Sequence, residues 1–170
     1  MPHISQVHAL AKEVGDTLKH YHLRLATAES CTGGQLAQTI TAIPGSSQWF
    51  ERGFITYSKL SKQELLNVQE ATLKNYGTIS RQTVEEMAKG VLKNSPVDIS
   101  IAITGIAGPE GGTEKTPVGT VYFAWACREP SFCEAYVQHF DDNERLTIRY
   151  AAVEFALQKL ISFVKKTFKS

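Results

Sequence analysis

The sequence LRLATAESCTGG, from Leu23 to Gly34, joins a short apolar segment to a polar turn that contains two glycines. Leu23 to Ala28 has the length and composition of a buried strand. Beyond the turn, apolar residues from Leu36 to Ile40 recur at helical spacing, which predicts a helix that starts at Thr32 and ends before Pro44. This stretch therefore predicts a strand that turns directly into a helix, as in an α/β protein.

The rest of the chain alternates between the same two patterns. Helices are predicted where apolar residues repeat at helical intervals, over residues 4–21, 58–66, 80–92 and 146–164. Strands are predicted at residues 50–56, 99–103, 118–126 and 133–140, the last two as an antiparallel hairpin at the sheet edge. Ser80 is the expected cap of its helix, and Ser61 with Glu64 has capping-box spacing. This order predicts an α/β fold with a mixed, largely parallel sheet.

Length, charge and cysteine content narrow the class of protein. The 170 residues fit a single domain spanning 1–170, and 42% hydrophobic with 21% charged residues is typical of a soluble globular chain. The net charge of +1 is too small for a broad nucleic-acid-binding face. No apolar run approaches the ~20 residues of a membrane span, and the N-terminus lacks a signal-peptide pattern. Three cysteines without metal-ligand spacing favour a cytoplasmic protein with free thiols.

Polar motifs follow three of the predicted strands at the point where each strand ends. Ser30 follows the first strand, Tyr57 the second, and Thr104-Gly105 the third. Parallel strands end at the same edge of a sheet, and ligands of α/β proteins bind outside that edge. We therefore expect these motifs to converge on one site.

Ser30 occupies the position of a nucleophile at a sharp strand-to-helix turn. Backbone N–H groups near Cys31 to Gly33, at the start of the helix, could stabilise an oxyanion, and Gly33 and Gly34 leave room for a substrate. The alternative is that Ser30 or Thr32 only caps the helix, and spacing alone favours this second interpretation.

A serine nucleophile needs a base, and the five histidines lie outside the predicted site. Lys62, in the first turn of a predicted helix five residues after Tyr57, is the better candidate, because a desolvated lysine can lose its proton near neutral pH. Tyr57 could relay the proton or hold the amine in place. On spacing alone, the favoured interpretation of Lys62 is a solvated surface residue, as is expected for Lys59.

Two further features could hold a substrate. The glycine-rich stretch from Gly105 to Gly112 could wrap a phosphate or a ring, or be a long surface loop, and it matches no phosphate-loop pattern. Arg145, at the start of the last helix, could anchor an anion through its fork of donors.

Four motifs in register resemble the CinA C-terminal domain family, in order from about Val7 to about Phe163. They are AESCTGG from Ala28, RGFITYS from Arg52 together with Lys62, TGIAGP from Thr104, and PVGTV from Pro117. The chain departs from the family pattern at Lys59, where the family usually has asparagine, and at Asn143-Glu144-Arg145, where it commonly has Gly-Asp-Arg.

The resemblance implies a three-layer α/β/α sandwich, commonly homo-oligomeric, that uses no cofactor or metal. It implies hydrolysis of the carboxamide of nicotinamide mononucleotide to nicotinic acid mononucleotide and ammonia, in pyridine nucleotide (NAD) salvage. Ser30 would be the nucleophile, Lys62 the base and Tyr57 the assisting hydroxyl. Cys31, Thr32, Gly33, Gly34, Thr104, Gly105, Gly108 and Arg145 are the expected oxyanion or substrate-binding residues. A catalytically silent nucleotide-binding domain, and an amidase or esterase for another small substrate, remain open alternatives.

Overall fold

Five strands form one mixed sheet in the computed structural model, which describes residues 2–169. The strands are β1 (Leu25–Glu29), β2 (Phe50–Ile55), β3 (Ile99–Gly105), β4 (Thr120–Cys127) and β5 (Phe132–His139), in the spatial order β2-β1-β3-β4-β5. β1 pairs in parallel with both β2 and β3, whereas β4 runs antiparallel to β3 and forms an antiparallel edge hairpin with β5. The predicted mixed, largely parallel sheet and its edge hairpin are confirmed.

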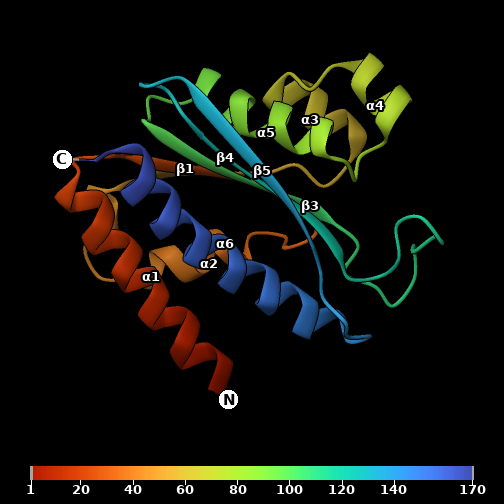
Figure 1. Ribbon diagram of the computed structural model, residues 1–170, viewed down its shortest axis with the longest axis horizontal. Helices are drawn as coiled ribbons and strands as arrows, with labels where there is room; N and C mark the ends of the chain where they lie inside the picture. Colours follow the sequence, from red (N-terminus) through yellow and green to blue (C-terminus); the bar gives the residue numbers. More distant parts are fainter. Residues whose placement is uncertain (1, 170) are drawn as a thin grey trace.

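Helices cover both faces of this sheet (Figure 1). They are α1 (Pro2–His20), α2 (Gln35–Thr41), α3 (Lys59–Leu66), α4 (Glu70–Tyr76), α5 (Arg81–Lys93) and α6 (Arg145–Thr167), with a short 3₁₀ turn, η1 (Ser46–Gln48). α1, α2 and α6 lie on one face, and α3, α4 and α5 lie on the other (Figure 1). Each face buries its own apolar cluster, so the fold is the expected three-layer α/β/α sandwich.

Helix starts differ from the sequence predictions in two places. The capping box of α3 is formed by Ser58 and Ser61, not by Ser61 and Glu64, because the helix begins at Lys59. The helix after β1 begins at Gln35, since Gly33 and Gly34 adopt positive φ and extend the turn beyond Thr32.

Two short elements, α4 and η1, were not predicted. A seven-residue helix with a single buried apolar side chain, Leu73, has too little hydrophobic periodicity to be recognised. The predicted cap of α5 is confirmed, because Ser80 Oγ accepts a hydrogen bond from the Thr83 N–H. None of the helices described is long and apolar enough to cross a membrane.

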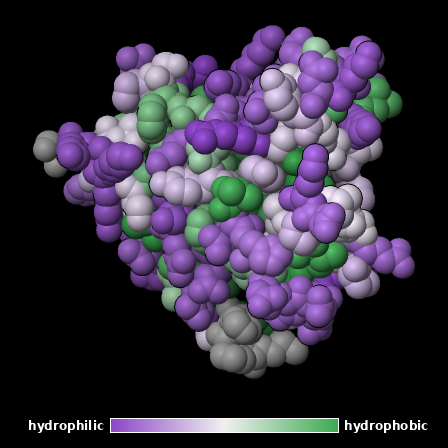
Figure 2. Space-filling view, turned by 45° about the vertical axis from the view of Figure 1, so that its right-hand side comes forward, coloured by the Kyte–Doolittle hydropathy of each residue, from purple (hydrophilic) through white to green (hydrophobic). Residues whose placement is uncertain are grey.

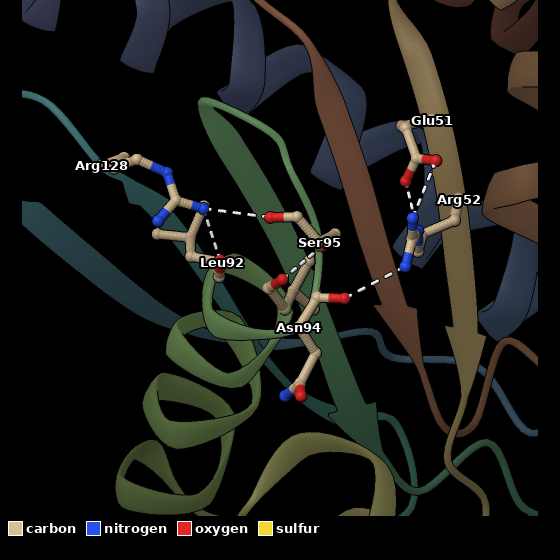
Figure 3. Close-up of polar contacts among 7 residues, drawn as sticks. Glu51, Arg52, Leu92, Asn94, Ser95 and Arg128 are labelled. Carbon is tan, nitrogen blue, oxygen red and sulfur yellow. Dashed lines mark hydrogen bonds and ion pairs between the residues drawn. The ribbon is translucent and has the colours of Figure 1, made fainter.

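Two arginines secure the C-terminal end of α5 (Figure 3). Arg128, just after β4, donates from one guanidinium nitrogen to the carbonyl oxygens of Leu92 and Ser95, and Arg52 of β2 donates to that of Asn94. The last carbonyls of a helix have no partner within it, and cations complement its C-terminal dipole. These contacts lie where β3 begins, so they fix α5 at the opposite end of the sheet from the Thr104-Gly105 motif.

Candidate active site

A cleft of about 250 Å³ lies at the edge where β1 and β3 end. Polar motifs from separate elements line it, as the parallel register of β1, β2 and β3 requires. The lining residues are Ser30, Cys31, Tyr57, Lys62, Thr78, Ile79, Thr104, Gly105, Ile106, Ala107, Gly108, Glu110, Gly111 and Arg145. The predicted convergence of three strand-end motifs is therefore confirmed.

The turn after β1 holds Ser30 in a fixed place. The Ser30 N–H donates to the Ile103 carbonyl of β3 at 3.0 Å, and the Ser30 carbonyl accepts from the Gly33 N–H at 3.0 Å. The N-cap of α2 is Gly34, with no side-chain cap, so the interpretation of Ser30 or Thr32 as a helix cap is wrong. The Ser30 hydroxyl instead accepts a hydrogen bond from Lys62.

Lys62 is a buried lysine, with 1% of its surface exposed. Its Nζ lies 3.0 Å from Ser30 Oγ and 2.6 Å from the Thr56 carbonyl oxygen. Burial withdraws the ammonium group from water and lowers the pKa of Lys62 from 10.5 to about 8. Lys59, at the first position of α3, is exposed and does not contribute to this shift. The interpretation of Lys62 as a solvated surface residue is therefore wrong.

Tyr57 and Arg145 form a second polar pair in the cleft. Arg145 donates from one nitrogen to the Tyr57 hydroxyl at 3.0 Å and from another to the Gly108 carbonyl at 2.8 Å. Tyr57 is 63% exposed at the cleft mouth, so its hydroxyl pairs with Arg145 rather than with the buried amine. Arg145 thus ties the glycine-rich loop to the end of β2.

Backbone donors near Ser30 are divided between two uses. The Leu36 and Ala37 N–H groups, at the start of α2, donate to the buried carboxylate of Glu29. Of the donors predicted near an oxyanion, the Gly33 N–H is also occupied, because it donates to the Ser30 carbonyl. Within residues 2–169, neither the Cys31 N–H nor the Thr32 N–H donates to another residue.

Eight of the expected site residues line the cleft, whereas Thr32, Gly33 and Gly34 do not. Thr32 is buried, and its carbonyl accepts from Arg149. Burial also raises the pKa of the Cys31 thiol, to about 12, which leaves the thiol protonated.

Sequence reasoning missed several lining residues. Ile106, Ala107, Glu110 and Gly111 belong to the glycine-rich stretch that was predicted only as a whole. Thr78 and Ile79 come from the segment after the unpredicted helix α4, and no local signal points to them. Thr104 Oγ1 donates to the Thr78 carbonyl at 2.8 Å, which joins that segment to β3.

Known proteins share both the sequence and this fold. The CinA C-terminal domain matches residues 7–164. The chain is 45% identical over 161 residues to the nicotinamide-nucleotide amidohydrolase PncC of Enterobacter agglomerans, covering 94% of this chain and 97% of that protein. It is 44% identical to the PncC protein of Escherichia coli K12, over 92% of this chain and 93% of that protein.

Solved structures of related proteins share the fold. The crystal structure of the competence/damage inducible protein CihA from Agrobacterium tumefaciens superposes with a TM-score of 0.89 at 39% identity, covering 92% of this chain and 94% of that one. A CinA superfamily protein from Klebsiella pneumoniae also gives a TM-score of 0.89, at 37% identity over 94% of this chain and 98% of that one. With a match from residue 7 to residue 164 and relatives above 40% identity, this chain belongs to the CinA C-terminal domain family.

Proposed function

We propose that this chain hydrolyses the carboxamide of nicotinamide mononucleotide to nicotinic acid mononucleotide and ammonia. Ser30 is the nucleophile, Lys62 the base and Tyr57 an assisting hydroxyl held by Arg145. The observation that carries the proposal is the 3.0 Å contact between the buried Lys62 amine and Ser30 Oγ. The amidohydrolase names of relatives that are about 45% identical over most of the chain support the substrate.

The surroundings of Lys62 suit a base. The Thr56 carbonyl oxygen holds one N–H of the amine at 2.6 Å, so the lone pair of the neutral amine can face the Ser30 hydroxyl. Its pKa of about 8 leaves a useful neutral fraction at physiological pH. A serine next to such a base is an activated nucleophile.

The reaction proceeds in two halves. Neutral Lys62 takes the Ser30 proton while Oγ bonds to the carboxamide carbon, and the carbonyl oxygen becomes an oxyanion. The lysine then gives the proton to the amide nitrogen, and the C–N bond breaks to release ammonia and leave an ester on Ser30. Water, deprotonated by Lys62, attacks this ester. Lys62 then returns that proton to Ser30 Oγ as the ester C–O bond breaks, and the acid product loses its remaining proton to solvent to become the carboxylate. The Cys31 and Thr32 N–H groups are the nearest donors for the oxyanion, because those of α2 are occupied.

Charges in the cleft complement a zwitterionic nucleotide. Glu110 is the one carboxylate among the lining residues, and Arg145 is the cation at the more exposed end. Nicotinamide mononucleotide carries a positive pyridinium ring and a negative phosphate. We propose that Glu110 faces the ring and that Arg145 lies nearest the phosphate, which the occupied start of α2 cannot bind.

Incubation of the purified chain with nicotinamide mononucleotide, followed by mass spectrometry and an ammonia assay, tests this function. Conversion that disappears in Ser30→Ala supports it. Nucleotide binding without ammonia release would indicate a silent binding domain. Equal kcat/KM for free nicotinamide would indicate another small-amide hydrolase, because an enzyme built for the nucleotide loses rate when the ribose phosphate is removed.

We also propose that the chain acts as a homo-oligomer in the cytoplasm and feeds its product to NAD salvage. Edge strand β5 exposes Phe132, Tyr136 and Val137, and Figure 2 shows other apolar patches among the polar side chains of one face. Three unpaired cysteines are compatible with a reducing compartment. Light scattering of the purified chain tests the oligomeric state.

A further inference from the structure

Glu29 is a carboxylate with no exposed surface, one residue before Ser30. Its Oε1 accepts from the Leu36 N–H at 2.8 Å, and its Oε2 accepts from the Ala37 N–H at 3.0 Å. It does not line the cleft. Both oxygens are therefore committed to the backbone at the start of α2.

These hydrogen bonds close the turn that carries Ser30. The turn leaves β1 at Glu29 and enters α2 through Gly33 and Gly34, with φ values of +57° and +100°. Such a glycine turn is intrinsically loose, because glycine has many accessible conformations. The Glu29 side chain reaches across it to α2, which Gly34 caps without a side chain, and its negative charge complements the helix start.

The backbone of Glu29 is linked to Lys62 through Thr56. Its carbonyl accepts from the Thr56 N–H at 2.9 Å, and the Thr56 carbonyl accepts from Lys62 Nζ at 2.6 Å. The side chain of Glu29 therefore fixes the turn of Ser30, and its main chain fixes the residue that orients Lys62.

We infer that Glu29 is a positioning residue that sets the separation of Ser30 Oγ and Lys62 Nζ. Its side chain also accepts the hydrogen bonds of the first free N–H groups of α2, so that the Cys31 and Thr32 N–H groups are the donors available to the oxyanion. The inference rests on the proposed function, because it assumes that Ser30 is the nucleophile.

Glu29→Gln tests the inference with almost no change of volume. Its amide NH₂ would face a backbone N–H, so one of the two hydrogen bonds is lost and the turn shifts. We expect kcat to fall about a hundredfold, the cost of a misplacement near 1 Å, with KM within about twofold of wild type. The rate at which a fluorophosphonate labels Ser30 should fall in parallel, which gives a readout independent of the amide substrate.

Glu86→Gln is the matched control. The Glu86 carboxylate accepts from the Gln69 N–H at 2.8 Å and from the Thr72 hydroxyl, at the start of α4 outside the cleft. This variant should lose stability but keep wild-type kcat and labelling rate.

Wild-type kcat and labelling in a folded Glu29→Gln protein would overturn the inference, as would an equal loss of kcat in Glu86→Gln. If Glu29→Gln does not fold, Glu29→Asp carries the test, because it keeps the charge but is one methylene too short to reach both N–H groups. Ser30→Ala separates the two proposals. Full turnover in Ser30→Ala refutes the proposed mechanism, whereas an inactive Ser30→Ala beside a fully active Glu29→Gln refutes only the role of Glu29.

Discussion

Lys62 Nζ lies 3.0 Å from Ser30 Oγ, although 32 residues separate them in the chain. Both side chains are buried, Ser30 at the end of β1 and Lys62 in the first turn of α3. A solvated lysine would stay protonated at neutral pH, whereas this one has a pKa of about 8. The pair therefore provides a nucleophile and a base in direct contact.

Ser30→Ala should lower kcat at least about a thousandfold, because removing a nucleophile leaves only binding and oxyanion stabilisation. Ser80→Ala is the matched control, since Ser80 caps α5 through the Thr83 N–H. It should cost about 1 kcal/mol of unfolding free energy and leave kcat unchanged. Ammonia release and urea unfolding measure the two effects. Residual turnover near wild type in Ser30→Ala would contradict the assignment.

The rate should rise with pH as Lys62 loses its proton. Because the neutral amine is the base, kcat/KM should increase through a midpoint near pH 8 and level off above it. Lys62→Arg should be inactive even at pH 10, since a guanidinium stays protonated. Lys59→Arg, at an exposed neighbour, should keep the wild-type profile. A flat profile from pH 6 to 10 would exclude Lys62 as the base.

Lys62 should also make stability depend on pH. Its pKa falls from 10.5 to about 8 on folding, so the buried ammonium destabilises the native state fully below pH 8. Between these values the unfolded chain binds more protons, and stability rises with pH. Relative to Lys62→Met, the wild type should therefore gain about 3 kcal/mol of unfolding free energy between pH 7 and pH 10.5. Urea unfolding at several pH values measures this difference. If the free energy of unfolding changes with pH in the same way for the wild type and for Lys62→Met, the prediction is wrong.

Tyr57→Phe should be milder than any change at Lys62. It removes only the hydrogen bond from Arg145, so we expect about a tenfold loss of kcat/KM. Tyr76→Phe, at an exposed tyrosine of α4, should have no effect. A loss in Tyr57→Phe as large as that in Lys62→Arg would place the Tyr57 hydroxyl in the proton transfer itself.

Arg128 should matter for stability and not for catalysis. Arg128→Ala removes the hydrogen bonds to the carbonyls of Leu92, Ser95 and Val97, at and just after the end of α5. It should cost about 1–2 kcal/mol of unfolding free energy, a figure kept low because the guanidinium is exposed. Arg81→Ala, which removes only an exposed ion pair with Glu85, should leave the free energy of unfolding close to that of the wild type, because solvent screens the pair. We expect kcat and KM to stay at wild-type values in both variants. A raised KM in Arg128→Ala would contradict a purely structural role for Arg128.

Local patterns were enough for most of the architecture. The β1 turn, the buried strand β3, the β4–β5 hairpin and the long helix α6 follow from hydrophobic periodicity and from where glycine and proline interrupt it. Helix α4 could not be predicted, because only Leu73 of its seven residues is buried. Thr78 and Ile79 were missed for the same reason, since the segment that brings them to the cleft follows α4.

The sequence by itself determined the α/β class, the strand-end positions of Ser30, Tyr57 and Thr104, and the candidacy of Lys62. Only the tertiary structure decided which polar groups meet. It brings Lys62 Nζ to Ser30 Oγ and Arg145 to the Tyr57 hydroxyl, 88 residues away in the chain. It also places the Glu29 carboxylate where it accepts a hydrogen bond from the Leu36 N–H at the start of α2. Secondary structure depends on near neighbours along the chain, whereas a hydrogen bond or a pKa shift depends on distance and on burial from water. Those two quantities are set by segments that the sequence keeps far apart and that packing brings together.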